Sequence, residues 1–193
     1  MRNKKVVIVG GTDGIGRAIA NALVHKNEVI IVGRSKEKGE DFVAKSGQNA
    51  RYLTTDLSLL NNIPPLVEQI RSIFDSVDHI VHTADILRTE RLETEEGLEI
   101  SIALNYFSRV LFNQMMLAEG DGSQPERIIH IAAAGFSPKK NFIDNFPIKP
   151  TINSFTAHTF GQWANDFYGL YMKDKLLPRG TSINILNPGY VTS

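Results

Sequence analysis

The stretch VVIVGGTDGIGRAIA, residues 6–20, decides the fold of this chain. An apolar run leads into a glycine-rich turn, and a helical pattern follows directly. Glycines at positions 10, 14 and 16 allow a tight turn, close approach of the backbone to a phosphate and tight packing of the helix on the strand. The amino end of the helix offers free N–H groups and a positive dipole end to a pyrophosphate. This order of strand, turn and helix predicts a dinucleotide-binding site.

Short apolar runs alternate with helical patterns along the rest of the chain. The expected strands are residues 5–10, 28–33, 50–55, 79–83, 127–132 and 181–186. The expected helices are residues 15–26, 37–47, 62–74, 95–117 and 154–177. Such alternation is typical of βαβ units, and continuous apolar runs are typical of strands buried on both faces. The sequence therefore predicts an α/β fold, with a doubly wound parallel sheet in a three-layer α/β/α arrangement, and a single domain over residues 1–193.

The composition is that of an ordinary globular protein, with 42% hydrophobic and 22% charged residues. Lys plus Arg and Asp plus Glu balance at 21 each, so no overall field attracts nucleic acid or an anionic membrane. The apolar run after MRNKK is too short for a signal peptide or a membrane span. Without cysteine there is no disulfide or thiolate metal site, and no histidine pair has metal-ligand spacing. We therefore expect a cytoplasmic protein without a metal.

The second expected strand ends in VGRSKEK, residues 32–38. A site selective for NAD would carry an acidic residue here to hold the ribose 2′-hydroxyl, whereas Arg34 suits a 2′-phosphate, assisted by Ser35 and Lys36. Asp13 in the glycine turn opposes a dianion nearby. The sequence predicts NADP(H) in preference to NAD(H).

Residues 134–153 form the one long irregular connection in the expected fold. Loops of this length in compact domains are usually functional or mobile. Because the segment follows a strand, we expect it at the carboxyl edge of the sheet, where ligands bind in such folds.

The chain resembles the short-chain dehydrogenase/reductases. The shared motifs are the Gly10-x-x-x-Gly14-x-Gly16 turn, Asp56-Leu57 after the third strand, Asn105 in a crossover helix, and Pro188-Gly189 followed by Thr192. The resemblance covers essentially the whole chain. It implies a Rossmann fold and an oxidoreductase that acts on the carbonyl or alcohol group of a small molecule.

The resemblance also implies roles for individual residues. Asp56 would contact the adenine amino group, residues 188–192 would meet the nicotinamide carboxamide, and Asn105 would hold a water of the proton relay. The cofactor-binding residues expected in this way are Gly10, Thr12, Gly14, Ile15, Gly16, Arg34, Ser35, Asp56, Leu57, Thr83, Ala84, Pro188, Gly189 and Thr192.

The catalytic part departs from the family pattern. Family members carry Asn-Asn-Ala-Gly after the fourth strand and a serine after the fifth, where this chain reads HTAD (82–85) and AAA (132–134). Their Tyr-x-x-x-Lys motif has two possible matches here, Phe155 with Thr159 or His158 with Gln162. Counting back from the Pro-Gly pair favours the second. In either register the serine, tyrosine and lysine are missing.

The exchange of tyrosine and lysine for His158 and Gln162 is chemically coherent. Tyrosine titrates near about pH 10 and needs a neighbouring cation to act at neutral pH, whereas histidine titrates near about 6.5 unaided. His158 would be the proton donor, and Gln162, on the same helical face, would bond the ribose. The alternative is that catalysis was lost and His158 is a surface or core histidine. Asp85 either acts near the nicotinamide or caps a turn or helix.

Other unusual residues have ordinary interpretations. His82 and His130 end their strands and are expected to be packed or solvated. Phe160, Trp163, Phe167 and Tyr171 recur at helical spacing, which indicates core or a subunit interface.

Three functions stay open at this stage. The first is an NADP(H)-dependent oxidoreductase with atypical catalytic residues Asn105, His158 and Gln162. The second is a non-catalytic dinucleotide-binding sensor or partner subunit. The third is a non-redox enzyme such as a dehydratase or cyclase. Family members usually continue past the final PGYVTS into a substrate loop and a last strand, which this chain does not show.

The resemblance also implies pairing through residues 98–118 and 155–176. We expect a homodimer, or a heterodimer with a related chain. The apolar residues expected at this interface include Ile102, Phe107, Leu111, Met115, Trp163, Phe167 and Tyr171.

Overall fold

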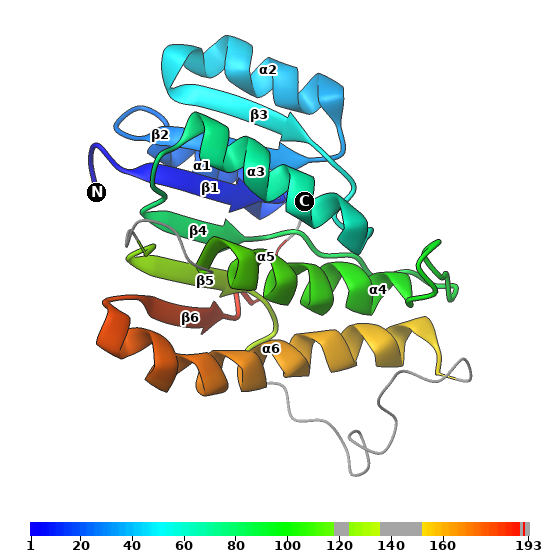
Figure 1. The fold of residues 1–193 in the computed structure, drawn as a ribbon. Helices are drawn as coiled ribbons and strands as arrows, with labels where there is room; N and C mark the ends of the chain where they lie inside the picture. The colour runs from blue at the N-terminus through cyan, green and yellow to red at the C-terminus, as the bar shows by residue number, and fades with distance from the viewer. Residues whose placement is uncertain (118–123, 136–151, 190, 192–193) are drawn as a thin grey trace.

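A computed structural model describes residues 1–193 except 118–123, 136–151, 190 and 192–193. The described strands form one parallel sheet in the order β3-β2-β1-β4-β5-β6 (Figure 1). Their bounds are β1 Lys5–Val9, β2 Glu28–Gly33, β3 Ala50–Thr54, β4 His79–His82, β5 Arg127–Ile131 and β6 Ser182–Leu186. The strand order reverses between β1 and β4, so the carboxyl edge opens there into a crevice. The predicted doubly wound parallel sheet is confirmed.

Helices cover the sheet on both faces. One face carries α1 (Gly14–Leu23) and α2 (Lys36–Ser46). The other, turned to the viewer in Figure 1, carries α3 (Ile63–Ile73), α5 (Ser108–Leu117) and α6 (Ser154–Leu176). Within the described ranges, no helix is long and apolar enough to cross a membrane. The expected cytoplasmic location stays a prediction.

Two apolar layers lie on the two faces of the sheet. On β1, Val6 and Ile8 point to the layer under α1 and α2, whereas Val7 and Val9 point to the layer under α3 and α5. All four side chains are at most 2% exposed. A strand buried on both faces needs apolar residues at every position, which explains the uninterrupted VVIV run.

The helix predicted over residues 95–117 begins later than expected. Residues 93–99 form a turn instead, with Gly97 at φ +76°. The Glu99 carboxylate accepts hydrogen bonds from the N–H groups of Ser101 and Ile102, which makes Glu99 the N-cap of α4 (Ile100–Ile102). From α4 the chain continues through a π-helical turn, Ala103–Phe107, into α5. The other predicted elements differ from the observed bounds by a few residues at most.

Candidate functional site

The glycine turn packs tightly against the end of β4. Gly10 has φ +97°, and a Cβ there would lie 2.3 Å from the amide nitrogen of Ala84. A Cβ on Gly16 would lie 2.3 Å from the carbonyl oxygen of Gly10 and 2.4 Å from the hydroxyl of Thr83. That hydroxyl donates to the Gly10 carbonyl at 3.0 Å. Only glycine fits at these two positions, and the turn therefore joins β1, α1 and β4.

The amino end of α1 lies at the surface of this turn. Asp13 caps the helix and accepts from the N–H of Gly14. The first bond closing the helix runs from the N–H of Arg17 to the Asp13 carbonyl at 3.1 Å, so the N–H groups of Ile15 and Gly16 lie ahead of it. Lys38 forms a salt bridge with the Asp13 carboxylate, and its hydrogen bond lowers the pKa of Asp13. The negative charge of Asp13, which would oppose a bound anion, is thus paired with the cation of Lys38.

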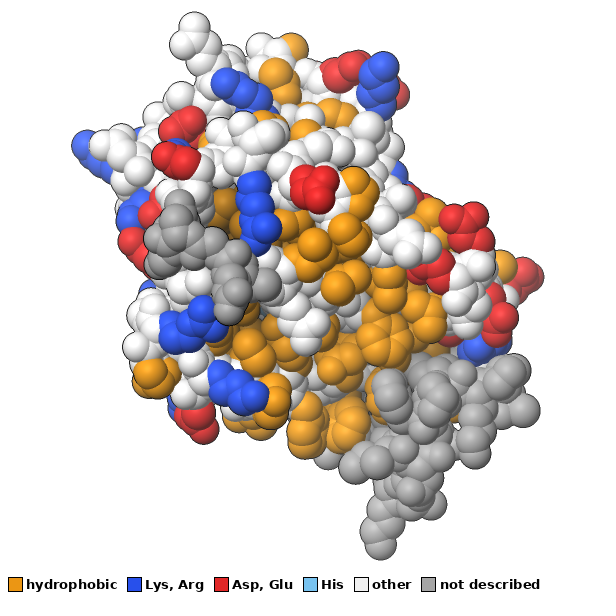
Figure 2. All heavy atoms as spheres, in the orientation of Figure 1, with side chains coloured by type: hydrophobic (Ala, Val, Ile, Leu, Met, Phe, Trp, Pro, Cys, Tyr) orange, Lys and Arg blue, Asp and Glu red, His pale blue; other side chains and the backbone are white. Residues whose placement is uncertain are grey.

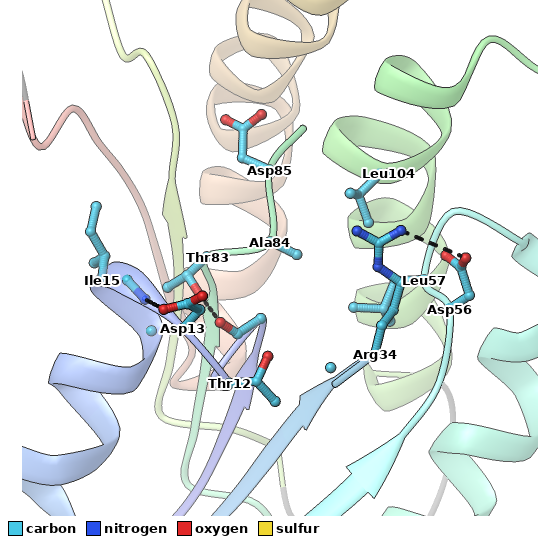
Figure 3. A pocket seen from close by; sticks show the side chains of 14 residues that line it. Thr12, Asp13, Ile15, Arg34, Asp56, Leu57, Thr83, Ala84, Asp85 and Leu104 are labelled. Atoms are coloured by element: carbon cyan, nitrogen blue, oxygen red, sulfur yellow. Dashed lines mark hydrogen bonds and ion pairs between the residues drawn. The ribbon is translucent and has the colours of Figure 1, made fainter. Parts of the chain in front are cut away.

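A cavity of about 420 Å³ opens at the carboxyl edge of β1, β2 and β4 (Figure 3). It brings together ten of the residues expected to bind the cofactor, namely Gly10, Thr12, Gly14, Ile15, Gly16, Arg34, Asp56, Leu57, Thr83 and Ala84. Ser35 is not among the lining residues. Its hydroxyl caps α2 by accepting from the N–H of Lys38. The lining also includes Leu104, which the motifs did not indicate, although it directly precedes Asn105.

Arg34 and Asp56 lie on one side of this cavity. Figure 3 shows the guanidinium reaching toward the carboxylate, and the two groups approach to 4.0 Å. The Asp56 carboxylate also accepts from the N–H and the hydroxyl of Ser58, at 2.9 and 2.6 Å. Asp56 is therefore held in place by Ser58, whereas Arg34 is more than half exposed and only loosely paired. An exposed and loosely paired guanidinium can bind an anionic group of a ligand.

A second cavity of about 220 Å³ adjoins the first and shares Ile15, Thr83 and Asp85 with it. Its remaining lining residues are Ile131, Ala132, Ala133, His158, Gln162, Asn187, Pro188 and Gly189. His158 and Gln162, one turn apart on α6, thus reach the site, whereas the competing match Phe155 is 64% exposed and lies elsewhere. Thr192 and most of the loop over 134–153 lie outside the described residues.

His158, Asp85 and Gln162 form a cluster in the smaller cavity. Nδ1 of His158 lies 3.0 Å from the Ile86 carbonyl and 3.4 Å from the Asp85 carboxylate. The Gln162 amide donates to Asp85 at 2.7 Å and accepts from the N–H of Ala133 at 2.9 Å. Both ends of the Gln162 amide are thus bonded to protein, so its expected contact with a ribose stays a prediction.

Asn105 lies beneath this cluster in the π-helical turn. Its side-chain amide accepts from the N–H of Ile86 at 2.9 Å and donates to the Ile86 carbonyl at 3.0 Å. The same amide nitrogen lies 3.0 Å from Nδ1 of His158. Asn105 therefore contacts His158 directly, and its expected role in holding a water stays a prediction.

The profile of the short chain dehydrogenase family matches residues 4–157. The chain belongs to this family. Two relatives illustrate the range of similarity. "Oxidoreductase andH" from Emericella variicolor is 32% identical over 66% of this chain and 41% of its own length. "Polyprenol dehydrogenase" from Danio rerio is 26% identical over 98% of this chain and 63% of its own length. The chain therefore spans less than two thirds of either relative.

Solved structures of short-chain dehydrogenases share the fold. An enzyme of the family from Streptomyces avermitilis superposes with a TM-score of 0.77 at 23% identity, over 100% of this chain and 68% of the other. One from Burkholderia cenocepacia J2315, in complex with NADP, gives 0.76 at 22% identity, over 97% and 74%. At this level of identity the likeness supports the fold, and the roles of single residues rest on the geometry above.

A fully buried arginine lies behind the small cavity of this family member. Arg109 on α5 is 1% exposed and donates to the carbonyls of Ala84 and Ile131, at 2.7 and 2.9 Å. Burial lowers the pKa of Arg109 to about 10, and the charge of Asp85 opposes that change. Arg109 thus ties the end of β4 to the end of β5 beneath the site.

Two histidines are linked in the core beneath the site, and both are fully buried. Nε2 of His82 lies 2.8 Å from the side-chain oxygen of Asn113. The side-chain nitrogen of Asn113 lies 2.9 Å from Nε2 of His130. Nδ1 of His130 lies 2.8 Å from the Asn165 amide oxygen. Burial, with Arg109 nearby, lowers the pKa of His82 to about 3, and burial lowers that of His130 well below its usual value. Both histidines were expected to be either packed or solvated, and the structure shows that they are packed.

Proposed function

We propose that this protein is an NADP(H)-dependent oxidoreductase acting on the carbonyl or alcohol group of a small molecule. The observation that carries the proposal is the pair of joined cavities, which brings the glycine turn, Arg34 and His158 to one continuous surface. Membership of the short chain dehydrogenase family supports it, as does the relative from Burkholderia cenocepacia J2315 in complex with NADP.

The residues of the larger cavity fit a dinucleotide. Gly14 lines it, and a Cβ added there would meet no atom of the described residues within 4 Å. The space beside this glycine is therefore free for a close ligand contact, such as a phosphate on the N–H groups of α1. Arg34 suits a ribose 2′-phosphate, which supports NADP(H) over NAD(H).

When bound, a nicotinamide dinucleotide supplies or accepts the hydride, and the chain must manage the accompanying proton. Nδ1 of His158 has two acceptors for its hydrogen, the Ile86 carbonyl at 3.0 Å and the Asp85 carboxylate at 3.4 Å. With the hydrogen kept on Nδ1 in both protonation states, Nε2 is the nitrogen left to exchange a proton with a substrate oxygen in the smaller cavity. A general acid–base group needs one nitrogen that is free to do so.

A second candidate function, a non-catalytic dinucleotide-binding sensor or partner subunit, is favoured by the three alanines over residues 132–134. Ala132 and Ala133 line the smaller cavity but carry no hydroxyl to orient a substrate oxygen. In this interpretation the protein binds the cofactor but catalyses no reaction.

Titration of NADPH and NADH, followed by nicotinamide fluorescence, tests the cofactor assignment. We expect NADPH to bind about 10- to 100-fold more tightly, and Arg34→Ala to remove most of the difference, because a charge-assisted bond to phosphate is lost. Arg51→Ala is the matched control, since Arg51 on β3 bonds the carbonyls of Gln48 and Ala50 outside the cavity. Equal affinities that Arg34→Ala leaves unchanged would overturn the preference. Binding without turnover on a panel of carbonyls and alcohols would select the second candidate.

We also propose that the chain pairs through α5 and α6. Figure 2 shows hydrophobic side chains gathered over these helices, and the exposed apolar residues of α6 include Phe167, Leu170 and Tyr171, at 53, 67 and 63%. Of the residues expected at the interface, Ile102 is only 1% exposed and belongs to the core instead. Light scattering at micromolar concentration distinguishes a dimer from a monomer.

A further inference from the structure

Asp85 occupies the junction of the two cavities. It lines both of them, and its side chain is 39% exposed. The Gln162 amide donates to one carboxylate oxygen at 2.7 Å, and Nδ1 of His158 lies 3.4 Å from the other. The carboxylate is therefore held in a fixed position with part of its surface open to a ligand.

Asp85 is the carboxylate that a ligand in the smaller cavity meets. Among the described residues lining that cavity, the only other titratable side chain is His158. Asp13 and Asp56 line the larger cavity alone, where Asp13 is paired with Lys38 and Asp56 faces Arg34. The smaller cavity thus presents a negative charge to its ligand wherever the imidazole is neutral.

The proposed function, on which this inference rests, puts the nicotinamide end of the cofactor in the smaller cavity, beside Pro188 and Gly189. The oxidised nicotinamide ring carries a positive charge and the reduced ring carries none, while the rest of the molecule is the same. A fixed carboxylate nearby therefore stabilises the oxidised form selectively. We infer that Asp85 sets the redox preference of the site: it favours binding of the oxidised cofactor over the reduced one, which makes the bound reduced cofactor a stronger hydride donor and so favours carbonyl reduction over alcohol oxidation.

The buried guanidinium of Arg109 acts in the opposite sense. It lies behind the cavity wall, bonded to the carbonyls of Ala84 and Ile131, so the carboxylate is the charge that meets the ligand. If Asp85 loses its charge, Arg109 stays positive and its unfavourable effect on the oxidised ring is no longer offset by a carboxylate.

Isothermal titration calorimetry with NADP⁺ and NADPH tests the inference without any turnover. The quantity measured is the ratio of the Kd for NADPH to the Kd for NADP⁺, at pH 8.5, where a histidine is ordinarily neutral. Asp85→Asn keeps the shape and an acceptor for Gln162 but removes the charge. We expect it to lower this ratio about tenfold, as for a charge screened by an environment between water and protein interior.

Two matched variants separate charge from other effects. Asp85→Glu keeps the charge and is expected to retain most of the wild-type ratio. Asp56→Asn neutralises a carboxylate of the larger cavity, so both Kd values move together and the ratio stays unchanged.

The outcomes separate this inference from the proposed function. If Asp85→Asn weakens both forms equally, Asp85 binds a part common to both, such as the ribose, and the inference is wrong while the dinucleotide site stands. If the wild-type protein binds neither form, the proposed function fails and the inference fails with it.

Discussion

The two adjoining cavities are built from different parts of the chain. The lining of the larger one includes the glycine turn, the amino end of α1 and the ends of β1 and β2. The lining of the smaller one comes from the ends of β4, β5 and β6 and from one face of α6. Backbone that must approach a ligand closely allows few residue types, so the larger cavity keeps its motif. The smaller cavity depends more on the identity of single side chains, which can change while the fold is kept.

The largest expected effect concerns the smaller cavity. If the protein is an active oxidoreductase, His158→Phe should lower kcat about 10²- to 10⁴-fold while cofactor affinity stays the same, because general acid catalysis contributes that much. Steady-state kinetics with a cofactor titration measures both. Equal activity of His158→Phe and wild type would remove His158 from the chemistry.

The reverse substitution completes this test. The variant combines His158→Tyr and Gln162→Lys with Ala132→Ser or Ala133→Ser, which introduces the residue types that the family resemblance implies here. Should it reduce simple carbonyls while the natural chain turns over nothing, the smaller cavity has lost catalysis and the second candidate function is correct.

The next effect concerns the larger cavity, where Gly14 and Gly16 have different roles. Gly16→Ala should destabilise the fold by about 3 kcal/mol, because its Cβ meets backbone and the Thr83 hydroxyl at 2.3 and 2.4 Å. Gly14→Ala should cost only about 1 kcal/mol, the strain of a left-handed backbone at φ +50°, but should weaken dinucleotide binding strongly. Thermal unfolding and calorimetric titration measure the two effects. Equal losses of stability would contradict the distinction.

A further effect, on the pH dependence of stability, comes from the core below the smaller cavity. The pKa of His82 is about 3 in the folded protein, against about 6.5 for an ordinary histidine. The unfolded chain therefore binds more protons as the pH falls below about 6.5, and stability declines from there toward the folded pKa. The expected slope is about 1.4 kcal/mol per pH unit for His82 and a similar amount for His130.

Urea unfolding between pH 7 and pH 5 measures this slope above the range where carboxylates titrate. His82→Asn should remove about half of it, whereas His25→Asn, at an exposed position, should leave it unchanged. A flat profile in wild type would mean that these histidines take up protons in the folded state.

The sequence predicted the backbone better than the side-chain network. Buried strands and glycine turns have local signatures, so all six strands were found. Gly97 and the Glu99 cap were overlooked, which put the start of the helix before α5 too early. The pairing of Asp85 with Gln162 and His158 joins residues more than 70 positions apart, and no local pattern indicates it. For that reason the sequence alone does not decide whether Asp85 is a turn residue or a functional one.

The buried side chains of His82, Asn113, His130 and Asn165 form a hydrogen-bonded network in which each bond has a fixed donor and acceptor. The Asn165 amide nitrogen donates to two carbonyls, those of Asn105 and Gly161, at 2.9 and 2.7 Å, which fixes its oxygen toward His130. Nδ1 of His130 must then carry the hydrogen, its Nε2 accepts from Asn113, and the Asn113 oxygen accepts from His82. Reversing the polarity would aim an amide oxygen at two carbonyl oxygens. A proton added to His130 would place an Nε2–H against the Asn113 amide nitrogen, which already donates there, so the network favours the neutral ring.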